Sequence, residues 1–104
     1  MVKTLFELKQ ILALAKHDAL LSIQGPDGGP CNFDYVIVNG QSVLFLKACE
    51  EVGLKAEKEI GRRIIRISNP DCSWQGWNNT HQAEAINKRL QLNGIESYVN
   101  YVID

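Results

Sequence analysis

The stretch Asn78–Asp104, with the sequence NNTHQAEAINKRLQLNGIESYVNYVID, decides how the rest of the chain is interpreted. Asn79 is suited to be a helix N-cap, because its side-chain oxygen can accept from the free amides of a first turn. Gln82, three residues later, is placed to complete a capping box. A helix is therefore expected after Asn79, with apolar residues at helical spacing: Ala83, Ile86 and Leu90.

The same stretch predicts the end of this helix and a strand after it. Gly94 is typical of the left-handed residue that stops a helix, and Ile95 is expected to fold back on the last turn. Beyond Gly94 the apolar period changes to two, which indicates a strand with one buried face. The residues expected on that face are Ile95, Val99, Tyr101 and Ile103.

The overall composition indicates one ordinary globular domain, 1–104. The chain has 104 residues, of which 45% are hydrophobic and 22% charged. Its net charge of -1 gives no overall field that would attract nucleic acid or an anionic membrane. With no apolar run of membrane-spanning length and no signal-peptide layout, a cytoplasmic location is expected.

The cysteines and histidines do not form a recognisable metal or disulfide pattern. Cys31, Cys49 and Cys72 are odd in number and include no CxxC pair, which favours reduced thiols. With only His17 and His81 available, no metal site and no cofactor are expected.

The N-terminal part predicts a helix that starts with a capping box of Thr4 and Glu7. One stripe of it faces a core: Leu5, Leu8, Ile11, Leu12 and Ala15. Lys16 and His17 are expected near its C-terminal end, where positive charge is favourable. A short strand, Leu20–Gln24, and a Gly/Pro loop, Gly25–Cys31, should come next.

The middle of the chain predicts a central strand over Phe33–Val38 and a helix that Ser42 caps and Gly53 ends. The pair Asn39-Gly40 leaves a hairpin with a second strand over Gln41–Leu46 as the alternative.

Two further strands are expected around Gly61. The segment Leu54–Ile60 alternates apolar and charged residues, and the segment 62–67 can pair with it as a hairpin. A helix over Lys55–Ile60 is the competing interpretation.

These elements together predict an α+β fold. Two strand–helix–strand units in tandem give a ferredoxin-like βαββαβ arrangement with both helices on one sheet face. The N-terminal helix and the short Leu20 strand would be additions that extend the sheet or cover its open face.

The loop Asn69–Asn79 is the first candidate binding site. It is long, and it holds Trp74 and Trp77, a residue type that often anchors binding sites. Asp71 and Asn78 lie beside them. The structural alternative is that the tryptophans only cover the edge of a small core.

Thiol catalysis is a second, weaker hypothesis. Cys72 lies near the start of the last predicted helix, with His81 in its first turn and Asp71 or Asp34 available to orient the imidazole. These residue types are common, and an inert thiol beside a solvent-facing histidine is the favoured interpretation, so an enzyme is not expected.

The basic strand is the third candidate. Arg62, Arg63 and Arg66 suit the backbone of single-stranded nucleic acid, but this strand carries no aromatic residue. Because Glu57 and Glu59 alternate with basic residues nearby, cross-strand charge pairs are the favoured interpretation.

The function expected from these patterns is that of a small binding protein. It would dock on a protein partner or on itself through an exposed sheet edge, as an accessory, inhibitory or adaptor protein. The alternative is a single-stranded nucleic-acid-binding domain, and a small-ligand or thiol site around Cys72 and His81 comes third.

Overall fold

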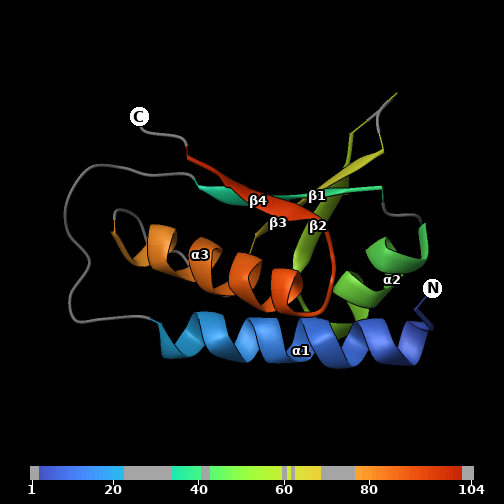
Figure 1. Ribbon diagram of the computed structural model, residues 1–104, viewed down its shortest axis with the longest axis horizontal. Coiled ribbons are helices and arrows are strands. Elements are labelled where there is room, and N and C mark those ends of the chain that lie inside the picture. Colours follow the sequence, from blue (N-terminus) through green and yellow to red (C-terminus); the bar gives the residue numbers. More distant parts are fainter. Residues whose placement is uncertain are drawn as a thin grey trace.

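The computed structural model describes residues 3–22, 34–40, 43–59, 61, 63–68 and 77–101. Within these ranges the chain forms three helices and a four-stranded antiparallel sheet (Figure 1). The α+β class predicted from the sequence is confirmed.

The sheet has strand order β2-β3-β1-β4. Strands β1 (Tyr35–Asn39) and β3 (Ile64–Ser68) lie at its centre, and β2 (Lys55–Lys58) and β4 (Ser97–Asn100) form its edges. Because β1 is antiparallel to β3 and β4, and β2 is antiparallel to β3, strands β1 and β2 run parallel with β3 between them. The predicted hairpin between β2 and β3 is confirmed.

Helix α2 (Val43–Val52) joins β1 to β2, so the alternative hairpin over this segment is wrong. The strand β2 likewise excludes the competing helix over Lys55–Lys58. Helix α3 (Trp77–Leu92) joins β3 to β4. It starts two residues before Asn79, which lies inside the first turn, so the predicted Asn79 cap is wrong.

Both crossover helices end in the predicted way. Gly53 and Gly94 adopt φ values of 82° and 76° after α2 and α3, respectively. The amide of Leu54 donates to the Cys49 carbonyl at 2.9 Å, and the amide of Ile95 donates to the Leu90 carbonyl at 3.0 Å. These bonds from the second residue past the cap are those of a Schellman motif, which returns the chain toward the sheet.

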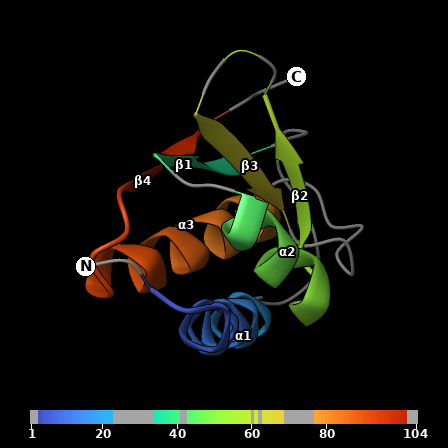
Figure 2. The same ribbon diagram turned by 90° about the vertical axis from the view of Figure 1, so that its right-hand side faces the viewer.

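The described elements form three layers. Helices α2 and α3 lie against one face of the sheet, and α1 (Leu5–Leu21) lies on the far side of these two helices (Figures 1 and 2). The expectation that the N-terminal helix extends the sheet or covers its open face is therefore wrong. Its apolar stripe packs on α2 and α3 instead, so no described helix covers the other sheet face.

The start of α1 is confirmed and its end is not. The amide of Glu7 donates to Thr4 Oγ1 at 3.2 Å, and the Thr4 amide donates to Glu7 Oε1 at 3.1 Å. The helix continues to Leu21 with Ser22 as its C-cap, so the predicted strand Leu20–Gln24 is wrong over Leu20–Ser22, and its remainder lies outside the described residues.

Lys16 of α1 contacts the C-terminal end of α2. It lies more than one turn before the end of α1, and its Nζ donates to the Val52 carbonyl at the C-terminal end of α2, at 3.3 Å. The prediction that Lys16 and His17 lie at the C-terminal end of α1 is therefore wrong, because α1 continues to Leu21 and its last turn holds no basic residue. Lys16 instead places its positive charge at the C-terminal end of α2.

The core lies between the layers and takes side chains from each of them. Its largest fully buried aliphatic and aromatic residues are Leu12, Val36, Val38, Phe45, Ile65, Ile67, Ile86 and Leu90. The predicted apolar face of the last strand is confirmed at Val99, which packs against the core. Ile95 is buried but lies before the start of β4, and Tyr101 is 57% exposed beyond its end. Ile103 lies outside the described residues.

Candidate functional site

The first predicted site lies only partly in the described region. Trp77 and Asn78 form the first turn of α3 instead of a loop, and their side chains lie outside the described residues. Asp71, Cys72 and Trp74 also lie outside them. The tryptophan-loop hypothesis therefore stays a prediction.

A polar cluster links the start of β1 to the first turns of α3. Asp34 is buried, and its carboxylate accepts a hydrogen bond from Thr80 Oγ1 at 2.5 Å. His81 Nδ1 is also buried and has no hydrogen-bond partner in the described part of the chain. A catalytic carboxylate would accept from this nitrogen, so Asp34 does not orient His81 as the thiol hypothesis requires.

Tyr101 extends this cluster to the residue after β4. Its hydroxyl donates to Glu84 Oε2 at 3.1 Å, which fixes the chain against α3. Partial burial raises the pKa of Tyr101, and the neighbouring Glu84 carboxylate raises it further. Together with the Asp34–Thr80 bond, this contact ties β1, α3 and the end of β4 to each other.

The open face of the sheet brings together residues from all four strands. The alternation of β1 and β3 directs Val36, Val38, Ile65 and Ile67 into the core, which leaves Ile37 and Arg66 on the other face. On that face Ile37 is only 9% exposed. The register places Tyr98, Ile37, Arg66 and Glu57 side by side in one row across the sheet.

Arg66 is the centre of this row. Its guanidinium lies 3.6 Å from Glu57 Oε2 and 3.6 Å from Glu59 Oε1, and it sits 5.5 Å from the centroid of the Tyr35 ring. The prediction of cross-strand charge pairs is confirmed at Arg66 and Glu57. Arg63 is exposed before the start of β3, so the two arginines do not form one basic row on the strand.

The surface that sequence reasoning missed is the outer stripe of α1. We define it as the residues on the side of the helix opposite its buried stripe: Phe6, Gln10, Ala13, Leu14, His17, Leu20 and Leu21. Phe6 is 68% exposed, Leu14 and Leu20 are 47% exposed, and Leu21 is 70% exposed. The signal was present in the sequence, because these apolar residues recur at helical spacing on a second face of α1.

The remaining chemistry of the described region is sparse. The Cys49 thiol is free and buried, and desolvation by that burial, reinforced by Glu50, raises its pKa to about 12. Among the residues that the structure describes, no group of His, Cys, Asp and Glu is arranged to hold a metal ion. Over the same residues, no helix combines the length and apolar character that crossing a membrane requires.

Comparison with protein-family models, with curated proteins and with solved structures gives no significant match in any of the three.

Proposed function

We propose that this protein is a small docking domain that binds a protein partner through the outer stripe of α1. The observation that carries this proposal is the exposure of large apolar side chains along one line of a single helix, from Phe6 to Leu21. An accessory, inhibitory or adaptor role fits such a domain.

Leaving the apolar side chains of this surface in water costs free energy. Full burial of a leucine or phenylalanine side chain contributes roughly 1.5–3 kcal/mol. A helix that is apolar on both faces is expected to be covered on both faces. One face of α1 is covered by α2 and α3, and the other is available to a partner.

The test compares Leu14→Glu with Leu92→Glu. Leu92 is the last residue of α3, is 69% exposed and lies outside the outer stripe. Leu92→Glu is therefore the control, because it makes the same substitution at an exposed leucine on another helix. In chemical cross-linking and pull-down from native lysate, Leu14→Glu should lose a discrete protein that wild type and Leu92→Glu both retain. Equal capture by all three folded proteins would contradict the proposal.

The tryptophan loop belongs to the same proposal as an additional anchor. Trp74→Ala and Trp77→Ala should weaken the interaction if Trp74, Trp77, Asp71 and Asn78 contribute to docking. Full retention of the partner by both folded variants would limit the docking surface to α1.

A second candidate is single-stranded nucleic-acid binding on the open face of the sheet. It is favoured by one observation: Tyr35 and Tyr98 share that face with Arg66, although they come from other strands. Aromatic rings on an exposed sheet are a surface on which bases stack. Glu57 and Glu59 beside Arg66 weigh against this candidate, because they repel phosphate.

The nucleic-acid candidate makes a distinct prediction. Binding of a fluorescent oligonucleotide should weaken steeply with salt, since phosphate contacts release counterions, and Tyr98→Ala should reduce it. Arg66→Glu should weaken it as well, whereas Arg63→Glu serves as the control at an exposed arginine outside the row. Affinity that is independent of salt would exclude the candidate.

The proposal includes a finer assignment of the fold and of the location. We assign the segment from β1 to β4 to a ferredoxin-like arrangement; its βαββαβ succession and its antiparallel pairing support this. This architecture serves many functions and does not select one.

A cytoplasmic location is supported by the free thiol of Cys49, which suits a reducing compartment.

A further inference from the structure

We propose that the partner of the outer stripe is a second copy of this chain, bound as an antiparallel pair of α1 helices. This inference rests on the proposed docking function of the same surface and names its occupant.

The shape of the surface suits a second helix. Helix α1 spans 17 residues, which corresponds to a length of about 25 Å. It stands as a ridge on the far side of α2 and α3 from the sheet (Figures 1 and 2). An elongated ridge packs well against another helix, with the side chains of each lying in the grooves of the other.

The outer stripe is largely complementary to itself when its direction is reversed. Its midpoint lies between Ala13 and Leu14, and Phe6 and Leu21 lie at equal distances on either side. In an antiparallel pair centred there, Phe6 of one chain opposes Leu21 of the other and Ala13 opposes Leu14, while Leu20 lies opposite Glu7. Such a self-complementary patch is what a twofold dimer requires.

The polar residues of the stripe agree with this pairing. Gln10 and His17 are also equidistant from the midpoint. Gln10 of each chain therefore lies opposite His17 of the other chain. An amide and an imidazole can form a hydrogen bond, since each offers both a donor and an acceptor. A parallel pair would instead oppose His17 to its own copy.

The charged residues of α1 are Glu7, Lys9, Lys16 and Asp18, and they flank the stripe. Lys9 is only partly buried at that flank. Asp18 is bound to Arg89, Lys16 to the Val52 carbonyl and Glu7 to Thr4, all within one chain. A second copy can therefore approach without separating these contacts.

The sheet edges are a weaker route to a dimer. Strands β2 and β4 have four residues each. Strand β2 carries Lys55, Glu57 and Lys58, and charge on a short edge strand opposes pairing with another edge. The outer stripe offers the more continuous apolar surface.

The first experiment is sedimentation of the full chain from about 1 μM to about 1 mM. One helix face is a small interface, so a dimer with micromolar dissociation is expected. Leu14→Glu and Leu21→Glu should each weaken it at least about tenfold, because they place a carboxylate in a desolvated contact. Leu92→Glu should leave the dimer unchanged, and circular dichroism verifies that each variant is folded.

The second experiment tests the orientation. Gln10 and His17 are seven residues apart, or about 10 Å along the helix. In a background with Cys31→Ser and Cys72→Ser, a mixture of Gln10→Cys and His17→Cys chains should form a mixed disulfide under mild oxidation. Each variant alone should cross-link much more slowly. Faster cross-linking of each variant with itself would overturn the antiparallel arrangement.

The outcomes separate this inference from the docking function. A wild-type chain that stays monomeric to about 1 mM overturns self-pairing. Docking would still stand if Leu14→Glu lost a different captured protein. A dimer that Leu14→Glu and Leu21→Glu leave unchanged overturns pairing through α1.

Discussion

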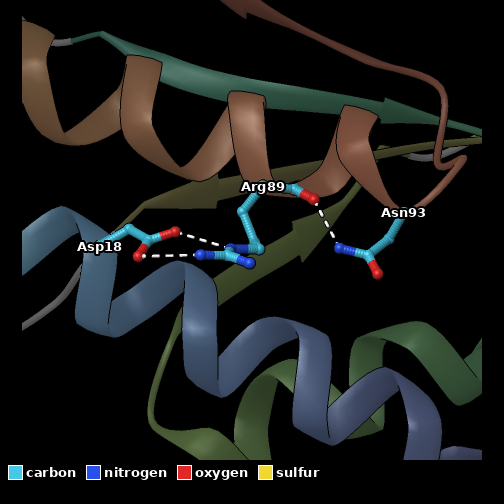
Figure 3. Close-up of polar contacts among 3 residues, drawn as sticks. All are labelled: Asp18, Arg89 and Asn93. Atoms are coloured by element: carbon cyan, nitrogen blue, oxygen red, sulfur yellow. Dashed lines mark hydrogen bonds and ion pairs between the residues drawn. The ribbon is translucent and has the colours of Figure 1, made fainter.

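Asp18 of α1 and Arg89 of α3 form an ion pair that joins the outermost layer of the molecule to the middle one (Figure 3). Asp18 Oδ2 lies 2.7 Å from Arg89 Nε, and Arg89 Nη2 donates to Asp18 Oδ1 at 3.3 Å. The hydrogen bond to Asp18, and then the charge of that carboxylate, raise the pKa of Arg89. The main-chain carbonyl of Arg89 also accepts from Asn93 Nδ2 at 2.8 Å (Figure 3). The two hydrogen bonds between Asp18 and Arg89 help to fix the rotation of α1 about its own axis, and thus the direction in which the outer stripe faces.

Replacement of Asp18 by Asn should lower the melting temperature by only a few degrees, because both side chains are partly exposed and solvent screens the pair. Arg89→Gln should remove the same ion pair. The loss of stability in the double variant should therefore be smaller than the sum of the losses in the two single variants. Thermal melts at low and high salt measure these effects. The difference in melting temperature between wild type and each single variant should be smaller in high salt, because salt screens the ion pair. Strict additivity would show that the two residues act independently.

The two helix-ending glycines should differ in their tolerance of alanine. At Gly94 nothing lies within 4 Å of an added Cβ, so Gly94→Ala carries only the strain of a positive φ, about 1–2 kcal/mol. At Gly53 the added Cβ would lie 2.8 Å from Lys16 Nζ, which then has to move from its contact with Val52. Because Nζ is the end of a flexible side chain, this shift is easy, and Gly53→Ala should cost only slightly more than Gly94→Ala in urea unfolding.

Lys16→Met provides the control for this comparison. With the ammonium removed, the extra cost at Gly53 should largely disappear, while the cost at Gly94 should not change. Equal costs of the two alanines in the wild-type background would contradict the role of Lys16.

The parts of the fold that were predictable from the sequence are those encoded within about five consecutive residues. The Thr4–Glu7 box and the ends at Gly53 and Gly94 depend on bonds between residues three to five apart, so their residue types identify them. The start of α3 was misplaced because Asn79 and Gln82 offered a plausible cap inside the helix. Residues 77–81 are weak helix formers, so propensity does not explain the earlier start. Thr80 in the first turn is instead held by its hydrogen bond to Asp34, a contact between distant segments.

The layer of α1 and the candidate surfaces were not predictable in the same way. A stripe such as Leu8 and Leu12 shows that one helix face is buried, but it does not show whether the sheet or other helices cover it. The grouping of Tyr35, Arg66 and Tyr98 likewise depends on strand register, which joins residues more than thirty positions apart. Long-range pairing of this kind is set by the assembled core rather than by any local pattern.

Two leucines on opposite sides of α1 provide a direct test of the three-layer arrangement. Leu12 is fully buried, and Leu12→Ala should destabilise the protein by about 2–5 kcal/mol through lost packing and a cavity. Leu14→Ala, at an exposed position of the same helix, should stay within about 0.5 kcal/mol when measured in dilute protein. Chemical denaturation of both variants measures the difference. Similar losses for the two would show that α1 is covered on both sides within a single chain.

The buried thiol of Cys49 makes a prediction about reactivity and pH. In the background with Cys31→Ser and Cys72→Ser, this cysteine should react with an aromatic disulfide reagent at pH 8 roughly a hundredfold or more slowly than in denaturant, because reaction requires an exposed thiolate. Burial raises its pKa from 9.0 to about 12, so the folded state retains the proton longer than the unfolded state. The resulting stabilisation is complete below pH 9 and decreases as the pH rises toward 12, by at most about 1.4 kcal/mol per pH unit. Cys49→Ala should remove this part of the alkaline slope in unfolding experiments. Rapid labelling of the native chain at pH 8 would instead place Cys49 outside the core.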